Sequence, residues 1–419
     1  MLYDGEFFYR GARLFCEDAD LTSLAESHGT PAYVYSKRAL LARFEAYTNG
    51  LAGVPHHICY SAKANSNIAV LGALARSGAG FDIVSGGELF RVLAAGADPR
   101  SVVFSGVGKT EAEIRFALAQ SIHSFNCESE AEIQTISRVA VAAGRAASIA
   151  LRVNPDVDAL THPYISTGLS EHKFGVHIAE APEIYRRAAA LPGIVVEGVS
   201  CHIGSQILDI DPLLEAADRA LSLVSELRAN GLSIRYLDLG GGLGVPYSIT
   251  VFLDRLRRKV EGAGLALLLE PGRSIAAEAG ILLTRVLAVK RNGPKTFVIL
   301  DAAMNDLLRP ALYRARHDLI PVVQDGAPQP VTADIVGPVC ESGDVFARDL
   351  ELTTVKPGDL FAFLTAGAYG FVLASNYNSR PRPCELLVDG AHVHVARDRE
   401  TYDDMIRGEH PLLIHTERT

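Results

Sequence analysis

The feature that most constrains the fold of this chain is a regular alternation of strand-like and helix-like segments between residues 58 and 270. Short runs rich in β-branched and aromatic residues predict eight strands, at Ile58–Ser61, Phe81–Val84, Val102–Ser105, Ile122–Phe125, Ser148–Val153, Val195–Cys201, Ile234–Leu239 and Leu265–Glu270. Helical patterns lie between these strands, at Asn67–Arg76, Gly87–Ala94, Glu111–Ala119, Glu128–Ala143, Pro182–Ala190, Pro212–Asn230 and Phe252–Ala263. Eight strands that alternate with helices are typical of a (β/α)8, or TIM, barrel. An open, doubly wound sheet remains the alternative, because periodicity alone does not show whether a sheet closes.

The pattern changes after residue 280, where strand-like runs are separated by Gly, Pro, Asp and Asn and few helical windows occur. We expect strands there, at Leu282–Lys290, Thr296–Leu300, Val331–Val336, Leu360–Leu364 and Glu385–Val388. The first 30 residues also contain short strand-like runs, which we expect to complete the same β domain. The predicted division is therefore a barrel at residues 33–275 and a β domain made of residues 1–32 and 276–419.

Composition excludes several classes of function. The 419 residues carry a formal net charge of -9, which disfavours nucleic acid or an anionic membrane as the main partner. The first ten residues contain Asp4 and Glu6 where a signal peptide needs a positive region and an apolar run. The six cysteines are scattered without a C-x-x-C pair, which favours reduced thiols in the cytoplasm over a disulfide framework or a zinc site. We therefore expect a cytoplasmic protein with no bound metal.

The barrel prediction directs attention to the carboxyl ends of the strands, where the chemistry of such barrels gathers. Five strands place reactive or flexible residues there: Lys63; Asp82; Cys201, His202 and Ser205 in C-H-I-G-S; Gly240, Gly241 and Gly242; and Glu270, Pro271, Gly272 and Arg273 in E-P-G-R. Each has an ordinary structural explanation when taken alone. A lysine at a strand end can extend its ammonium to water, and a run of glycines is most often a tight turn. Together on one rim, they indicate a site.

These residues suit the chemistry of pyridoxal 5'-phosphate. The aldehyde of this cofactor needs a lysine amine to hold it as a Schiff base, and Lys63 is the candidate. Its phosphate needs unobstructed backbone N–H groups, which the glycine run and Gly272 supply after strands seven and eight. Its pyridine nitrogen needs a carboxylate that keeps it protonated, and Glu270 is placed for that role. His202 could stack on the ring, and Ser205 could donate to the phosphate.

Four motifs, Y-S-A-K-A-N, S-C-H-I-G-S-Q, L-D-L-G-G-G-L-G and E-P-G-R, resemble those of the alanine-racemase-type pyridoxal phosphate decarboxylases. Four further stretches resemble the diaminopimelate decarboxylases within that group: T-H-P-Y-I-S-T-G with K-F-G-V (161–176), N-D-L-L-R-P-A-L-Y (305–313), G-P-V-C-E-S-G-D (337–344) and G-A-Y-G (367–370). The resemblance covers nearly the whole chain in order. It implies decarboxylation of meso-2,6-diaminopimelate to L-lysine and carbon dioxide, the last step of lysine biosynthesis.

The resemblance also implies a role for each matching residue. It makes Lys63 the Schiff-base lysine and Glu270 the partner of the pyridine nitrogen, and it makes Cys340 a proton donor that reaches the other subunit's cofactor in a homodimer. Residues implied near the phosphate or cofactor are Gly241, Gly242, Gly272, Arg273, Ser205 and Tyr369. Residues implied to contact substrate are Arg273, Arg309, Tyr313, Glu341 and Tyr369.

The far end of diaminopimelate gives a physical argument beside the resemblance. That end carries a second carboxylate and a second amine, which Arg309 and Glu341 could bind respectively. The ordinary alternative is that Arg309 forms a surface ion pair and that Cys340 is a small buried hydrophobic residue. For the whole protein, the alternatives are a racemase, a decarboxylase of another basic amino acid such as ornithine or arginine, and a catalytically silent binding protein on the same scaffold.

Overall fold

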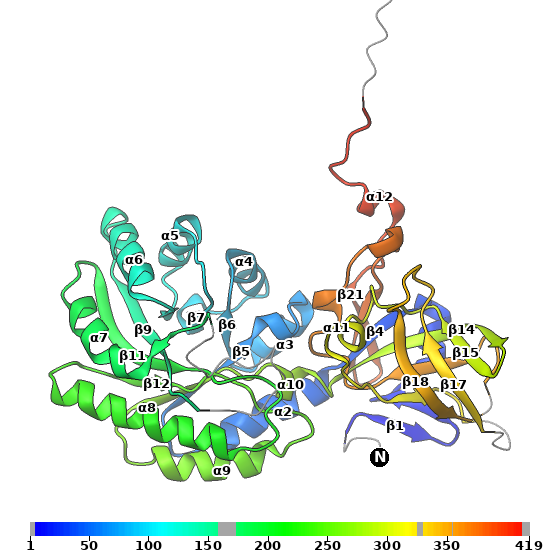
Figure 1. Ribbon diagram of the computed structural model, residues 1–419, viewed down its shortest axis with the longest axis horizontal. Helices are drawn as coiled ribbons and strands as arrows, with labels where there is room; N and C mark the ends of the chain where they lie inside the picture. The colour runs from blue at the N-terminus through cyan, green and yellow to red at the C-terminus, as the bar shows by residue number, and fades with distance from the viewer. Residues whose placement is uncertain (1–4, 158–172, 325–329, 354, 413–419) are drawn as a thin grey trace, which may run out of the picture.

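The computed structural model describes residues 5–157, 173–324, 330–353 and 355–412, and its first part is a closed barrel (Figure 1). Eight parallel strands pair in sequence, and the last pairs with the first, so that the sheet has no edge. The prediction of a (β/α)8 barrel is confirmed, and the open-sheet alternative is wrong. The barrel strands are β5 (His56–Ser61), β6 (Gly80–Ile83), β7 (Val102–Phe104), β8 (Ser124–Cys127), β9 (Ala147–Asn154), β11 (Ile194–Cys201), β12 (Tyr236–Asp238) and β13 (Ala266–Leu269).

Helices surround the barrel strands, and several of them begin at side-chain caps that the sequence supplies (Figure 1). Ser85, Thr110 and Ser129 each accept a hydrogen bond from a backbone N–H in the first turn of the helix that follows. The helices of this part are α2 (Lys37–Gly50), α3 (Ile68–Arg76), α4 (Gly86–Ala94), α5 (Glu111–Gln120), α6 (Glu130–Ala142), α7 (Ala181–Ala189), α8 (Asp211–Ala229), α9 (Ile249–Val260) and α10 (Arg273–Ala276). The short strand β10 (Val176–His177) pairs with β9 on the outside of this order.

One barrel strand lies two residues later than expected. The sequence predicts a strand at Ile122–Phe125, but β8 spans Ser124–Cys127. Ser121 takes a left-handed conformation after α5, and the N–H of Ile122 donates to the carbonyl of Ala117, so this residue still belongs to the end of the helix. The shift matters because it places Asn126 inside the strand and Glu128 just after it.

The second part of the molecule is a nine-stranded, mostly antiparallel sheet (Figure 1). Its path runs β18 (Val345–Leu352), β17 (Val331–Val336), β15 (Lys295–Leu300), β14 (Gly280–Asn292), β4 (Ala32–Ser36), β20 (Cys384–Asp389) and β21 (His392–Arg397), with β19 (Leu360–Phe363) and β16 (Leu319–Pro321) paired beside β14. The prediction missed β16, β18 and β21. Strand β16 has only three residues, and β18 and β21 are edge strands whose residues are mostly exposed or half-buried.

The amino-terminal strands β1 (Phe7–Arg10), β2 (Arg13–Cys16) and β3 (Ala19–Asp20) form a small sheet of their own, followed by α1 (Leu21–His28). Leu14 and Cys16 pack in one hydrophobic cluster with Val34 and Leu283 of the larger sheet. The next strand, β4, pairs with β14 and β20 in the larger sheet. Residues 33–36, which were predicted to begin the barrel, therefore belong by pairing to the other sheet.

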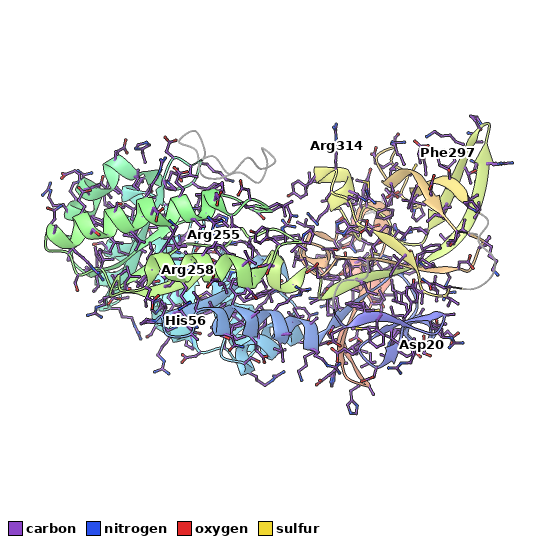
Figure 2. The ribbon with its side chains drawn as sticks, turned by 90° about the horizontal axis from the view of Figure 1, so that it is seen from below. Asp20, His56, Arg255, Arg258, Phe297 and Arg314 are labelled. Atoms are coloured by element: carbon purple, nitrogen blue, oxygen red, sulfur yellow. The ribbon has the colours of Figure 1, made fainter. Side chains whose placement is uncertain are left out.

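The two parts lie side by side along the long axis of the molecule, and Figure 2 shows His56 and Arg258 in the barrel and Phe297 and Asp20 at the far side. The second part also carries α11 (Arg309–Tyr313) and, near the carboxyl end, α12 (Tyr402–Met405). None of the helices in the described ranges combines the length and the apolar composition that a membrane crossing requires.

Candidate active site

A cavity of about 460 Å³ lies where the carboxyl ends of the barrel strands meet the second part of the molecule. The barrel contributes residues from seven strand ends, and the segment after residue 300 contributes Arg309, Tyr313 and Tyr369. Larger hollows, of about 1270 Å³ beside β18 and about 900 Å³ at the other end of the barrel, contain neither the lysine nor the glycine loop predicted for the site. The cavity brings together Lys63, His202, Ser205, Gly242, Glu270, Gly272, Arg273, Arg309, Tyr313 and Tyr369.

Lys63 lies in a short turn of 3₁₀ helix (Ala62–Ala64) that directly follows β5. Its Nζ donates to Oδ2 of Asp82 at 2.7 Å, and the hydroxyl of Ser61 donates to the same oxygen at 2.7 Å. Burial alone would lower the pKa of Lys63, but the charges of Asp82 and Glu270 outweigh it, and the pKa is raised above its usual range. Lys63 is therefore an ammonium held against a carboxylate, and 38% of its side chain remains exposed in the cavity wall.

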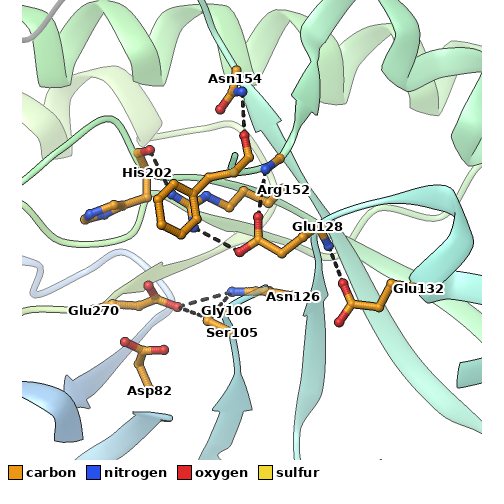
Figure 3. Close-up of polar contacts among 12 residues, drawn as sticks. Asp82, Ser105, Gly106, Asn126, Glu128, Glu132, Arg152, Asn154, His202 and Glu270 are labelled. Carbon is orange, nitrogen blue, oxygen red and sulfur yellow. Dashed lines mark hydrogen bonds and ion pairs between the residues drawn. The ribbon is translucent and has the colours of Figure 1, made fainter. Parts of the chain in front are cut away.

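Glu270 is the centre of a buried acidic group at the end of β13 (Figure 3). Its Oε1 accepts from Asn126 Nδ2 at 3.1 Å and from the Ser105 hydroxyl at 3.2 Å. The same amide donates to Asp238 at 2.7 Å. Burial, followed by the charges of Asp238 and Asp82, raises the pKa of Glu270 well above its usual value. A cation placed against Glu270 would reverse that effect.

His202 and the glycine loop lie against one another. The imidazole Nδ1 of His202 accepts from the N–H of Gly241 at 3.2 Å. Burial, followed by the positive charges of Arg152 and Lys63, lowers the pKa of His202 well below its usual value, so the ring is neutral. A Cβ at Gly241 would overlap the carbonyl oxygen of Glu270, and Gly242 has a φ of 110°, which side chains rarely tolerate. The loop is glycine because two strand ends approach there with no room for a side chain.

Two guanidinium groups face the same cavity without a carboxylate partner among the described residues. Arg273 donates to the hydroxyl of Ser205 at 3.1 Å, and its Cζ lies 4.7 Å from the centre of the Tyr369 ring. Arg309 contacts Nε2 of His317 at 3.2 Å. Burial, followed by the charge of Arg273, lowers the pKa of Arg309 to about 10. Arg309 is thus not part of a surface ion pair, and the two cations form a site for anions.

Cys340 and Glu341 do not line this cavity. Cys340 is exposed, its N–H donates to Asn378 Oδ1 at 2.7 Å, and the Tyr377 hydroxyl donates to Glu341 at 3.3 Å. The ordinary alternative for Cys340, a small buried hydrophobic residue, is therefore wrong. The remaining predicted residues lie at the rim as expected: Pro271 accepts from the N–H of Ser61 at 3.1 Å, and Gly240 carries the carbonyl that accepts from the N–H of Glu270 at 2.8 Å.

Comparison with known proteins assigns the family. Residues 37–277 match the family model described as "Pyridoxal-dependent decarboxylase, pyridoxal binding domain". Diaminopimelate decarboxylase of Pseudomonas aeruginosa is 53% identical over 410 residues, which cover 96% of this chain and 98% of that protein. This chain belongs to the diaminopimelate decarboxylase family.

Solved structures of the family share the fold. The diaminopimelate decarboxylase of Helicobacter pylori complexed with L-lysine is 42% identical with a TM-score of 0.89, over 92% of this chain and 98% of that one. The enzyme of M. jannaschii in co-complex with L-lysine is 36% identical with a TM-score of 0.93, over 98% and 99%. The family cofactor is pyridoxal phosphate, as its model states.

The residues of the cavity fit that cofactor. Two buried nitrogens of residues that line it, Arg152 Nε and Arg273 Nε, have no hydrogen-bond partner among the described residues. The glycine loop keeps side chains away from one end of the cavity, and Glu270 lies ready to ionise beside a cation. A lysine, an acidic group and an anion site are the three features that an aldehyde, a protonated ring and a phosphate require.

Sequence reasoning missed part of this family site. Ser105, Asn126 and Arg152 line the cavity or hold Glu270, and all three lie at or just after the ends of β7, β8 and β9. Applying the strand-end rule to all eight strands would have found them. Of the motif at 161–176, residues 161–168 lie outside the described part of the chain, whereas Phe174 of K-F-G-V lines the cavity.

Proposed function

We propose that this chain decarboxylates meso-2,6-diaminopimelate to L-lysine and carbon dioxide with pyridoxal 5'-phosphate, the last step of lysine biosynthesis. The observation that carries the proposal is that Arg273 and Arg309 both face the lysine-containing cavity without a carboxylate partner among the described residues. The cofactor brings one phosphate to this pair of arginines. A substrate whose single carboxylate is the one lost in the reaction would therefore leave one arginine without an anion. The far carboxylate of diaminopimelate supplies that anion, and two solved relatives were complexed with L-lysine.

Pyridoxal phosphate supplies an aldehyde for a lysine amine and a protonated ring that accepts electrons. Lys63 would hold the aldehyde carbon after giving up a proton, and Asp82, 2.7 Å from its Nζ, is placed to receive it. Glu270 would stay ionised beside the protonated ring nitrogen, while Asn126 and Ser105 keep its carboxylate in position. His202 would present a neutral ring to the cofactor.

The anion sites divide between the two arginines. Arg273, Ser205, Gly240, Gly241, Gly242 and Gly272 would hold the phosphate end together with the neighbouring Tyr369. Arg309 and Tyr313 would bind the far carboxylate of the substrate, and the deep location of Arg309 excludes much of the water that competes for such a contact.

We further propose that the active unit is a cytoplasmic homodimer. Cys340 and Glu341 are exposed on the surface outside their own chain's cavity. In the dimer, Cys340 would donate the proton that replaces carbon dioxide, and Glu341 would bind the far ammonium, both at the partner's cavity. We also propose that the chain divides into the two domains expected from its sequence, with the barrel domain starting at α2.

The test is to supply meso-diaminopimelate, ornithine and arginine separately to the protein loaded with cofactor, and to measure carbon dioxide. Release from diaminopimelate alone is expected, because an ornithine-type substrate has no far carboxylate for Arg309. Preference for ornithine or arginine would contradict the substrate assignment while leaving the decarboxylase chemistry in place. Borohydride reduction followed by peptide mapping should label Lys63, and labelling of another lysine would overturn the cofactor assignment.

A further inference from the structure

A buried ion pair that the proposed chemistry does not use lies in the wall of the cavity (Figure 3). Arg152, at the end of β9, donates through Nη1 to Oε1 of Glu128 at 3.0 Å. The two side chains are only 9% and 4% exposed. Burying such a pair generally adds little to stability, because both charges lose their water. Its position therefore calls for an explanation other than stability.

Arg152 contacts two residues of the cavity wall. Its Nη2 donates to the main-chain carbonyl of His202 at 3.3 Å, and its Cζ lies 4.7 Å from the centre of the Phe174 ring. His202 and Phe174 both line the cavity, yet they lie on different segments of the chain. One planar guanidinium thus contacts both His202 and an aromatic residue from another segment of the cavity wall.

Glu128 holds both Arg152 and the segment that carries Phe174. Its Oε1 accepts from Arg152, while its Oε2 accepts from the N–H of Gly175 at 2.7 Å. The amide of Asn154 donates to the carbonyl of Phe174 at 2.6 Å, so both polar groups of the peptide bond between Phe174 and Gly175 are held. Every polar atom of the Glu128 carboxylate is therefore used to place residues that line the cavity.

A second ion pair, between Lys109 and Glu132, is hydrogen-bonded to the first through the backbone of Glu128. The N–H of Glu128 donates to Glu132 at 2.7 Å, and the other oxygen of Glu132 accepts from Lys109 Nζ at 2.7 Å. Lys109 is 1% exposed and also donates to the carbonyls of Gly106 and Asn126, both at 2.8 Å. The chain of contacts joins the ends of three neighbouring strands, β7, β8 and β9, into one rigid wall.

We propose that Arg152, held by Glu128, is a positioning residue for the decarboxylation: it fixes His202 against the cofactor and Phe174 against the substrate as one unit. The inference rests on the proposed function for its substrate, but not for its effect on the cofactor. Small displacements of the residues in this wall should slow the reaction strongly, since about 1 Å of misplacement can lower the rate on the order of a hundredfold.

The experiment compares Arg152→Met, Glu128→Gln and their double variant with the wild type, each loaded with pyridoxal phosphate. Cofactor Kd, the visible circular dichroism band of the bound cofactor, kcat and KM for diaminopimelate, and the melting temperature are measured for each. Arg152→Met should lower kcat about a hundredfold, weaken the cofactor and change the dichroism, because His202 loses its anchor. Glu128→Gln should change the same quantities in the same direction.

The matched control is Arg187→Met. Arg187 pairs with Glu130 between two helices of the same barrel, but its side chain is 42% exposed and lines no part of the cavity. This variant should keep wild-type kinetics and dichroism. The double variant should lie within about threefold of Arg152→Met, because residues that act as one unit are not additive.

Wild-type kinetics, cofactor Kd and dichroism in Arg152→Met and Glu128→Gln would overturn the proposal, as would losses that track the melting temperature alone. If Arg152→Met does not fold, Arg152→Lys is the variant that tests the proposal. A lysine keeps the charge but cannot bond Glu128 and the His202 carbonyl in the same forked geometry, so a changed dichroism and a lowered kcat are expected and wild-type values overturn the proposal. If the wild type releases no carbon dioxide from diaminopimelate, the proposed function fails, while cofactor Kd and dichroism still test Arg152.

Discussion

The two sides of the cavity are built in different ways. On the barrel side, Lys63, Asp82 and Glu270 lie at strand ends, and each is held by hydrogen bonds at or below 3.2 Å. On the other side, Arg309 contacts His317, and Cys340 stands outside the cavity on an exposed turn. The barrel side is thus held by hydrogen bonds within the chain, whereas the described residues supply no carboxylate partner for Arg309 on the other side.

The difference separates a part of the site that one chain holds rigidly from a part that, in our proposal, a second chain completes. Under the proposed function, the groups that hold the cofactor lie at the ends of a closed sheet, which needs no reorganisation when the reaction occurs. Those that meet the substrate, Arg309 and Tyr313, lie on the short helix α11 outside the barrel. If this division holds, changes on the barrel side should have the larger effects.

The largest effect is expected for Lys63→Ala. Removal of the one lysine among the described residues that line the cavity should lower kcat by about 10⁴-fold or more, as for other residues that act as a catalytic unit. Borohydride should then fix no cofactor on the protein. The measurement is carbon dioxide release with mass analysis of the reduced protein. Lys37→Ala, which removes a partly exposed ion pair with Asp389 at 2.5 Å, is the control and should keep full activity.

Glu270→Gln, also on the barrel side, distinguishes an effect on cofactor binding from an effect on turnover. The amide keeps the shape of Glu270 but cannot hold a proton on the ring nitrogen, so kcat should fall by roughly 10²–10³-fold while cofactor still binds. Cofactor Kd and kcat are measured on the same preparation. Wild-type kcat in this variant would remove Glu270 from the mechanism. Glu261→Gln, at a side chain 66% exposed, is a matched control.

Arg309→Ala tests the other side of the cavity. Loss of the carboxylate partner should cost about 2–5 kcal/mol, or roughly 30-fold to several thousandfold, and within that range we expect a loss of at least about a hundredfold in kcat/KM for diaminopimelate. Lysine, which lacks the far carboxylate, should inhibit the wild type only weakly. Near-normal kcat/KM in the variant would contradict the substrate proposal. Arg316→Ala is the control, because its side chain lies close in sequence and is 86% exposed.

Subunit mixing tests whether the exposed turn belongs to a second copy. Lys63→Ala and Cys340→Ala proteins should each be inactive alone, but together they form a heterodimer with one intact site. Statistical mixing should restore up to about a quarter of the wild-type rate, as the two-fold symmetry of an isologous dimer implies. The rate is followed while subunit exchange is measured separately. Exchange without recovery would place both residues in one chain's site and remove the contrast between the two sides.

The smallest effect concerns the histidine that supports Arg309. His317 Nδ1 donates to the carbonyl of Leu364 at 2.9 Å, so its Nε2 accepts from Arg309 and the ring is neutral. Burial is the main cause that lowers the pKa of His317 to about 4, from 6.5. Between these values the unfolded chain binds a proton that the folded protein does not, so stability falls as pH drops below about 6.5.

The free energy of unfolding should therefore decrease by about 2 kcal/mol from this one group between pH 7.5 and pH 5. Denaturant titrations at both pH values measure the change, and His317→Gln should remove that part of it. The exposed His392→Gln should leave the pH dependence as in the wild type. An equal pH dependence in His317→Gln would show that His317 is not held neutral.

The sequence predicted the barrel more fully than the second sheet, for a physical reason. Barrel strand β7, V-V-F, is buried along its whole length and reads as a short apolar run. Strand β8, S-F-N-C, is equally buried but carries two polar residues, and its predicted position was two residues too early. The edge strand β18, V-F-A-R-D-L-E-L, is mostly exposed or half-buried, so its residues carry no clear apolar pattern. Residues 33–36 were expected in the barrel, but β4 pairs with β14 and β20 of the second sheet, and this pairing is not visible in the local sequence.

By itself, the sequence determined that Lys63, the glycine loop and Glu270 share one rim, because the ends of parallel strands meet wherever the strands lie in the chain. Only the tertiary structure decided which neighbours control them. Asn126 lies 144 residues from Glu270 in the chain, yet its amide donates to that carboxylate at 3.1 Å. The raised pKa of Glu270, the pairing of Arg152 with Glu128 and the closeness of Arg273 to Arg309 likewise depend on burial and on separations of a few ångströms. Charge interactions at that range change strongly with distance and with loss of water. The distances between these groups and their burial cannot be read from the order of the residues.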